Sequence, residues 1–176
     1  NLYNWAHLAH HFLGKTYFEV GEYPKSQDHF DKAAKLLEPI SMAPGFTNLN
    51  KIGGARSKVM RNEKDIELRS LCEYAAENQI SVFDGRMAKY IAEILLNIDD
   101  QHAFEAEDWV RKAIEADKRN GMMFYLGRDH ALYAELFRRK GNQSKAKENL
   151  RKAIDIFKEC GADGWVKKYE KEMATL

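Results

Sequence analysis

The sequence predicts an all-α protein in which antiparallel helix pairs stack side by side, and three observations support this. The apolar residues recur at helical rather than alternating spacing. Only three prolines occur in 176 residues, so long uninterrupted helices are allowed. One pattern of small and bulky residues returns along the chain, as expected for repeated structural units. We therefore expect one α-solenoid domain over residues 1–176.

The repeated pattern is clearest in three charge-rich segments, each expected to form the second helix of a pair. Each segment has an alanine on its apolar face, a bulky apolar residue three positions earlier and a small residue seven positions earlier. Small residues let two helix backbones approach closely, while the bulky residue fills the groove beside them. The three sets are Ser26, Phe30 and Ala33; Ala106, Val110 and Ala113; and Ala146, Leu150 and Ala153.

The first helix of a pair shows a matching pattern in the first and last repeats. Gly21 and Gly141 stand twelve positions before the alanines of their sets, and Gly14 and Ala134 stand nineteen positions before them. A glycine at the turn can end the first helix in a left-handed conformation, and Pro24 suits the first turn of the second helix. The small residues further upstream allow the two helices to pack closely.

The remaining elements follow from turn and capping signals. The segment 38–45, "EPISMAPG", holds two of the three prolines and is the one obvious irregular connector. A longer loop, "NIDDQHAF", replaces the turn glycine of the third pair, and its Asp99 and Asp100 are expected to cap helix ends rather than act as catalytic carboxylates. The second pair matches the pattern poorly. The expected helices span residues 2–20, 23–37, 45–60, 65–79, 86–97, 103–119, 122–140, 143–160 and 163–174, which gives pairs over 2–37, 45–79, 86–119 and 122–160.

The last helix is expected to cap the stack. Gly161 can end the preceding helix and Asp163 can begin the next one. The helix over 163–174 is amphipathic, and its charged face suits solvent at the end of a solenoid. Its apolar face holds Trp165, Val166, Tyr169 and Met173.

These residues resemble a known family. The residues Leu13, Gly14, Tyr17, Gly21, Tyr23, Phe30 and Ala33 resemble the signature of the tetratricopeptide repeat (TPR), whose period is about 34 residues. The resemblance covers most of the chain and is most specific at its two ends. It implies a right-handed superhelix whose inner helices line a concave groove for peptides or partner domains, and it implies no enzymatic activity.

The same resemblance explains the triplet Gly14-Lys15-Thr16, which ends like a phosphate-binding P-loop. A P-loop needs a second glycine five positions earlier, where this chain has Ala9, and it needs a preceding strand. In the repeat interpretation, Gly14 is a helix-packing glycine and the two following residues have no part in nucleotide binding.

Composition excludes several classes of function. The net charge is +1, so no overall field favours nucleic acid or an acidic membrane. No apolar run is long enough for a membrane helix, and no secretory signal opens the chain. Cys72 and Cys160 lie far apart and outside any metal or redox motif, so we expect reduced thiols and a cytoplasmic location.

The sharpest candidates for chemistry have simpler structural explanations. His7, His10 and His11 share a helix face and could hold a metal ion, but no carboxylate or thiolate motif accompanies them, so we expect a structural role and neither metal nor cofactor. The basic run 138–140 is too short for nucleic-acid recognition and suits a solvated helix end. The tryptophans are expected to anchor the core and the cap; they are Trp5, Trp109 and Trp165.

The inner-helix positions define a predicted binding groove. Cationic groups outnumber anionic ones in this set, so the groove is predicted to prefer an acidic helix or a C-terminal carboxylate, with arginines available for bidentate pairing. The alternative is that these charges only solvate a surface. The Asn–Asn–Lys carboxylate clamp of chaperone-binding TPRs is not reproduced. The predicted groove residues are His11, Lys15, Phe18, Glu19, Arg86, Lys89, Glu93, Arg128, Glu135, Arg138 and Arg139.

Three functional hypotheses remain. The chain from Tyr90 onward is also similar in texture to the C-terminal helical regions of large bacterial signalling proteins of the nucleotide-cyclase or signal-transduction ATPase type, although no cyclase or ATPase residues are present. The chain begins with Asn1 rather than Met, so we expect a piece of a longer protein. The first hypothesis is therefore a non-catalytic interaction or regulatory segment of such a protein. The second is a free-standing TPR adaptor, and the third is a metal-dependent helical enzyme built on the histidines.

Overall fold

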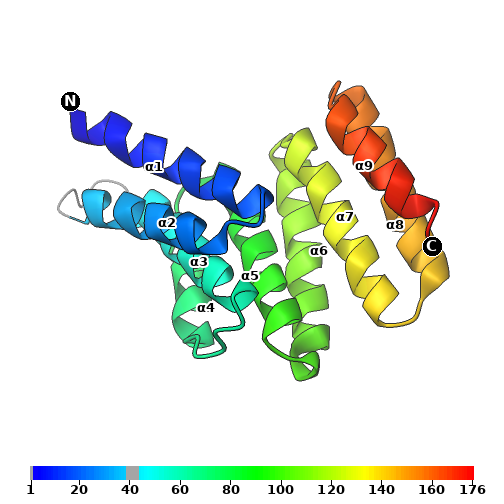
Figure 1. Ribbon diagram of the computed structural model, residues 1–176, viewed down its shortest axis with the longest axis horizontal. Helices are drawn as coiled ribbons and strands as arrows, with labels where there is room; N and C mark the ends of the chain where they lie inside the picture. The colour runs from blue at the N-terminus through cyan, green and yellow to red at the C-terminus, as the bar shows by residue number, and fades with distance from the viewer. Residues whose placement is uncertain (1, 39–43) are drawn as a thin grey trace.

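The computed structural model describes residues 2–38 and 44–176, and throughout that part of the chain the regular elements are helical. Successive helices lie side by side from the N-terminal to the C-terminal end of the molecule (Figure 1). The helices are α1 (Leu2–Glu19), α2 (Tyr23–Leu37), α3 (Pro44–Met60), α4 (Leu68–Ala76), α5 (Asp84–Ile98), α6 (Ala103–Arg119), α7 (Met123–Arg139), α8 (Gln143–Glu159) and α9 (Asp163–Met173), with short 3-10 helices η1 (Ser81–Phe83) and η2 (Asp100–His102).

The expected stack of helix pairs is confirmed. Helices α1 and α2, α5 and α6, and α7 and α8 form close antiparallel pairs, and each pair also packs against the next element along the chain. Helix α3 contacts α5 directly as well as its own short partner α4. The fold is thus an all-α solenoid of stacked helix pairs.

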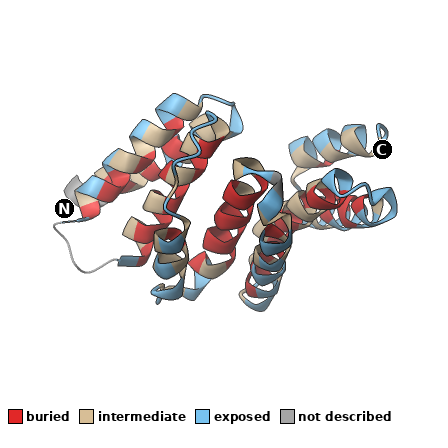
Figure 2. Cartoon of the chain, turned by 90° about the horizontal axis from the view of Figure 1, so that it is seen from below, coloured by how far each residue is buried: buried red, intermediate tan, exposed pale blue. Residues whose placement is uncertain are grey.

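The nine residues of the repeated pattern are all fully buried between helices, as predicted (Figure 2). The hydroxyl of Ser26 donates a hydrogen bond of 2.8 Å to the carbonyl oxygen of Gly14, which joins α1 to α2. A Cβ at Gly14 would lie 3.0 Å from the ring of Phe30, and one at Gly53 would lie 2.9 Å from it. The two glycines therefore make room for this ring between α1 and α3.

Four of the described α-helices are followed by the same kind of glycine turn. Glycine has a positive φ after α1, α6, α7 and α8, at Gly21, Gly121, Gly141 and Gly161. After α1, the amide of Glu22 donates to the carbonyl of Tyr17, and the amide of Gly21 donates to that of Phe18, as in a Schellman motif. The turn at Gly121 was not predicted.

The second pair departs from the predicted boundaries. The helix expected over 65–79 is shorter, because α4 covers only Leu68–Ala76. The side chain of Asn78 accepts a hydrogen bond from the amide of Ile80 and donates to Asp84, so it forms a turn where a further helical turn was expected. Residues 39–43 of the predicted connector lie outside the described part of the chain.

The expected capping role is confirmed for Asp99, whose carboxylate accepts hydrogen bonds from the amides of Gln101 and His102 at the start of η2. The side chain of Asp100 lies outside the described part of the structure. The expected core position of Trp5 is wrong, because 72% of this residue is exposed. Trp109 and Trp165 are half-buried against the core.

The C-terminal helix covers the last pair, as expected of a cap. Val166 is buried on α8, and the ring of Phe157 stacks on Trp165 and Tyr169 with both centroid distances at 5.7 Å. Helix α9 thereby also places aromatic side chains beside the inner surface of the stack.

Candidate functional site

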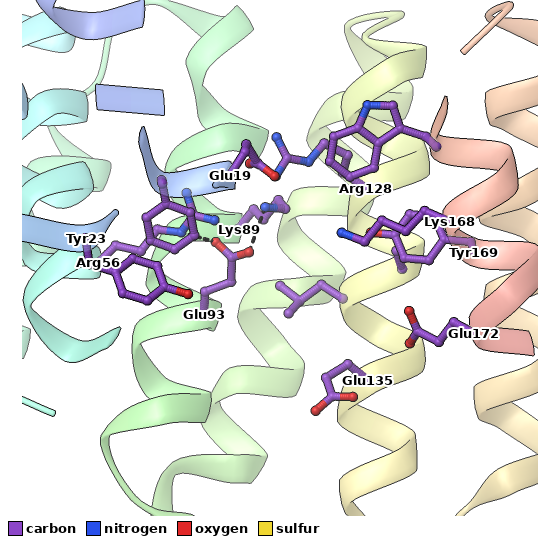
Figure 3. A pocket seen from close by; sticks show the side chains of 14 residues that line it. Glu19, Tyr23, Arg56, Lys89, Glu93, Arg128, Glu135, Lys168, Tyr169 and Glu172 are labelled. Carbon is purple, nitrogen blue, oxygen red and sulfur yellow. Dashed lines mark hydrogen bonds and ion pairs between the residues drawn. The ribbon is translucent and has the colours of Figure 1, made fainter. Parts of the chain in front are cut away.

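A cavity of about 350 Å3 opens on the inner side of the stack, among α1, α3, α5, α7 and α9 (Figure 3). Its lining combines aromatic rings with charged side chains of both signs. The lining residues are Phe18, Glu19, Tyr23, Arg56, Lys89, Glu93, Arg128, Ala131, Leu132, Glu135, Trp165, Lys168, Tyr169 and Glu172.

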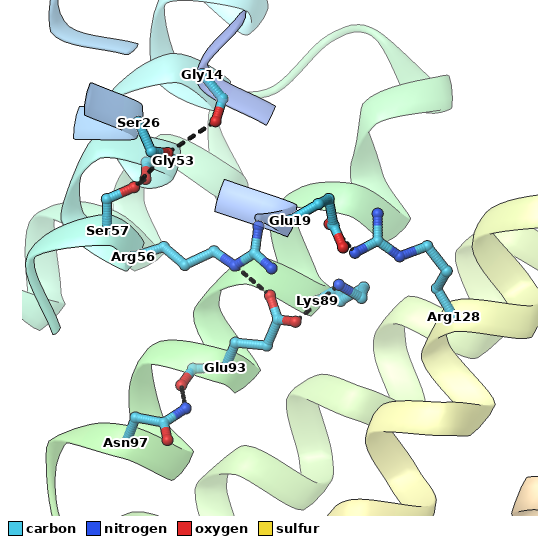
Figure 4. Close-up of polar contacts among 10 residues, drawn as sticks. All are labelled: Gly14, Glu19, Ser26, Gly53, Arg56, Ser57, Lys89, Glu93, Asn97 and Arg128. Atoms are coloured by element: carbon cyan, nitrogen blue, oxygen red, sulfur yellow. Dashed lines mark hydrogen bonds and ion pairs between the residues drawn. The ribbon is translucent and has the colours of Figure 1, made fainter. Parts of the chain in front are cut away.

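Glu93 lies at the centre of a buried charge cluster (Figure 4). Its two carboxylate oxygens lie 2.5 Å from Nε of Arg56 and 2.8 Å from Nζ of Lys89. Burial alone would raise the pKa of Glu93, but the charges of Arg56 and Lys89 outweigh this effect and hold the pKa below its usual value. Burial lowers the pKa of Lys89 to about 8, although the charge of Glu93 opposes that shift.

Two aromatic rings hold the arginine of this cluster. The guanidinium carbon of Arg56 lies 3.3 Å from the ring centroid of Phe18 and 4.4 Å from that of Tyr90. Planar guanidinium groups stack well on aromatic faces, so the rings fix the orientation of Arg56 toward Glu93. Arg56 therefore joins α1, α3 and α5 at one side of the cavity.

A second set of contacts joins the first helix to the seventh. Arg128 of α7 forms an ion pair with Glu19 of α1, 109 positions earlier. Nearby, Nζ of Lys15 donates a hydrogen bond of 3.0 Å to the hydroxyl of Tyr125. Glu19 and Arg128 both line the cavity, so their ion pair joins α1 to α7 there (Figure 4).

Helix α9 supplies the opposite wall (Figure 3). Nζ of Lys168 lies 4.8 Å from the ring centroid of Trp165 and 5.2 Å from that of Tyr169. Within the described part of the chain no carboxylate lies at ion-pair distance from Lys168, unlike the other cations of the lining. Burial raises the pKa of Glu172, and the charge of Glu135 raises it further.

The predicted groove residues fall into two groups. Six line the cavity, and the other five lie elsewhere. The lining members are Phe18, Glu19, Lys89, Glu93, Arg128 and Glu135, and the others are His11, Lys15, Arg86, Arg138 and Arg139.

The residues outside the lining support the walls instead. Arg86 is buried, with its guanidinium carbon 4.3 Å from the ring centroid of Tyr125. Arg138 and Arg139 both bind Glu135, and Arg139 also donates a hydrogen bond to the carbonyl of Leu96 at the end of α5. These two arginines therefore hold Glu135 in place.

The three N-terminal histidines lie in different environments. His11 is buried and lies 2.8 Å from the side-chain oxygen of Asn50, and burial lowers its pKa to about 4. His10 contacts His29 on α2, at 2.7 Å between Nδ1 atoms, while His7 is buried against Phe46. Across the described residues, no group of three or more His, Cys, Asp or Glu side chains could hold a metal ion.

Sequence reasoning missed one wall of the cavity. The signal was present for α9, because Gly161 follows Gly121 by 40 positions, as Lys168 follows Arg128. Because α9 was interpreted only as a cap, this register was not used to predict lining residues. The missed lining residues are Tyr23, Arg56, Ala131, Leu132, Trp165, Lys168, Tyr169 and Glu172.

The cavity does not have the excess of positive charge that the predicted residue set has. Its lining cations equal its carboxylates in number, and most are paired with each other. The cations are Arg56, Lys89, Arg128 and Lys168, and the carboxylates are Glu19, Glu93, Glu135 and Glu172.

Comparison with known proteins identifies one part of the stack. Residues 130–160, which include the second half of α7 and all of α8, match the family model of the tetratricopeptide repeat. Repeats of this family typically bind protein or peptide partners and are typically non-catalytic. No curated protein matches the chain. None of the described helices has both the length and the apolar character needed to cross a membrane.

Proposed function

We propose that this tetratricopeptide repeat protein binds a peptide segment of a partner protein in the cavity among α1, α3, α5, α7 and α9. The observation that carries the proposal is the convergence of five inner-facing helices on one concavity with several aromatic rings in its wall. Aromatic side chains supply large contact areas at low entropic cost, which favours them as anchors for a partner.

We further propose that the bound segment presents a carboxylate to Lys168. The ammonium of Lys168 has no protein carboxylate among the described residues, whereas Arg56, Lys89 and Arg128 are already in ion pairs. The rings of Trp165 and Tyr169 lie beside it and suit an apolar side chain next to that carboxylate. An acidic residue or a free C-terminus of the partner meets these requirements.

The proposed role is non-catalytic, as is typical of tetratricopeptide repeats, and three of the four lining cations are already held in ion pairs. We propose that the chain is a cytoplasmic regulatory segment of a larger bacterial signalling protein. Its partner is then another protein or a neighbouring domain of the same chain, rather than nucleic acid or a membrane. A free-standing adaptor would use the same cavity.

A peptide-display library tests the binding proposal. Selected peptides are synthesised with a free C-terminal carboxylate and with a C-terminal amide, and their affinities are measured by fluorescence anisotropy at several salt concentrations. We expect acidic or free-carboxylate peptides to bind, and their affinity to fall as salt rises. Selection of basic peptides, or of none, would contradict the proposed ligand chemistry.

The variant Lys168→Glu, with Lys167→Glu as its control, assigns the binding to the cavity. Both lysines lie on α9 and are exposed, but only Lys168 lines the cavity. We expect Lys168→Glu to weaken binding by roughly tenfold or more, or about 1.4 kcal/mol, and the control to leave it unchanged. Equal effects of the two variants would place the bound peptide on another face.

A further inference from the structure

Helix α1 carries an apolar stripe that faces away from the stack. Large exposed apolar residues occur here at Trp5, Phe12, Leu13 and, just after the helix, Val20. The exposed fraction is 72% for Trp5 and 66% for Val20. More than half of the large exposed apolar residues in the described chain belong to this stripe. Such a patch at a solenoid end is an interaction surface.

The internal repeat shows what covers the same positions elsewhere. Helices α1 and α7 share one register, in which Gly21 corresponds to Gly141, 120 positions later. The contact of His10 with His29 corresponds to the contact of His130 with Asn149, at 3.0 Å between Nδ1 and Oδ1. The two repeats therefore share this contact between their paired helices.

In α7, two of the positions equivalent to the stripe, Tyr133 and Lys140, contact the preceding helix, α6. The hydroxyl of Tyr133 contacts Glu107 and Arg111 of α6, both at 3.1 Å. Lys140 also pairs with Glu107 at 2.6 Å, and Leu136 is fully buried. The equivalents of Leu132, Tyr133, Leu136 and Lys140 are Phe12, Leu13, Thr16 and Val20.

We propose that a helix of a preceding repeat, in the same polypeptide, packs on this stripe of α1 as α6 packs on α7. Helix α6 directly precedes α7 in the chain. A helix placed in the same way before α1 would fall within roughly the twenty residues upstream of Asn1. The stripe has the uncharged Val20 at the position where α7 has Lys140. We therefore expect the covering helix to present an apolar residue where α6 presents Glu107, the ion-pair partner of Lys140. The inference is independent of any ligand in the cavity.

Hydrogen exchange tests this directly. The amides of residues 5–20 are compared in the 176-residue chain and in the polypeptide that includes its natural residues upstream of Asn1. We expect these amides to exchange at least tenfold more slowly in the longer polypeptide, with the amides of α8 unchanged. Equal exchange in both proteins would overturn the proposal, as would a natural polypeptide that begins at Asn1. A dimer of the 176-residue chain with slow exchange in α1 would also overturn it, because a second copy would then cover the stripe.

A variant gives an independent measurement. Val20→Glu should leave the melting temperature of the 176-residue chain unchanged, because the residue is exposed there. It should lower that of the longer polypeptide by several degrees, because the charge would be buried at the new junction. Val82→Glu, the same change at an exposed residue of η1, is the control and should affect neither protein. An unchanged melting temperature for Val20→Glu in the longer polypeptide would contradict the proposal.

Discussion

Glu19 and Arg128 form an ion pair between α1 and α7, although 109 positions separate them in the chain. These helices belong to the first and fourth helix pairs, which are not neighbours along the chain. The pair exists because the stack curves until the first and fourth helix pairs face each other across the cavity.

The first prediction concerns this ion pair. Glu19→Gln and Arg128→Gln should each weaken the contact between the ends of the stack, and the charge swap Glu19→Arg with Arg128→Glu should restore it. Arg128 is only 10% exposed, but Glu19 is partly solvated, so we expect a coupling free energy of about 1 kcal/mol. Urea unfolding of the unchanged protein, the two glutamine variants and the variant with both glutamines measures this coupling free energy. Additive effects of the two single changes would show that the pair contributes nothing to stability.

The second prediction tests the helix register. Ala153 is fully buried between α7 and α8, so Ala153→Leu should overpack the junction and cost about 1–3 kcal/mol of unfolding free energy. Ala174→Leu, the same change at an exposed position after α9, should cost little. Chemical denaturation measures both. A neutral Ala153→Leu would be inconsistent with the burial described here.

The parts of the fold that sequence could predict depend on neighbours within one repeat. The buried set that includes Ala33 and Phe30 follows from side-chain volume at fixed helical spacing, and the turns at Gly21 and Gly141 follow from backbone conformation. These constraints are local, so they remain visible in a single sequence.

The cavity was only partly predictable because its walls depend on curvature accumulated over several repeats. Arg56 was missed because its repeat departs from the common pattern, and its stacking on Phe18 requires α3 to meet α1 in space. Arg138 lies on the predicted face but binds Glu135 on its own helix. The repeat pattern does not predict which carboxylate an arginine will bind. The position of a residue in the repeat thus predicts which helix face points inward, but not which charged side chains on that face lack an ion-pair partner.

The third prediction concerns the cap. Val166 of α9 is buried against α8, so Val166→Asp should place a charge in the aromatic cluster around Phe157. We expect loss of cooperativity in unfolding, and self-association detected by light scattering, because the end of the solenoid becomes uncovered. Deleting residues 163–176 should do the same. Lys167→Asp, at an exposed neighbouring position, is the control, and an identical unfolding curve for Val166→Asp would exclude a capping role.

The last prediction concerns pH. Asp117 of α6 and Asp129 of α7 are buried, and each carboxyl group affects the pKa of the other. Burial raises the pKa of Asp117 to about 6, and burial together with the charge of Asp117 raises the pKa of Asp129 well above its usual value. This pair of aspartates therefore binds more protons in the folded protein than in the unfolded chain above about pH 4, where unfolded aspartates ionise.

It follows that the contribution of this pair to stability should be greatest in mild acid and should fall as the pH rises through the raised pKa values of the pair, whereas the lowered pKa of His11 has the opposite effect in acid. Asp129→Asn removes one of the two titrations and keeps a donor for Asp117, so it should stabilise the protein at pH 7–8 and flatten this decline. Melting temperatures between pH 4 and pH 8 measure the effect, with the exposed Asp155→Asn as the matched control. A decline of the same steepness in Asp129→Asn would show that the buried pair does not cause it.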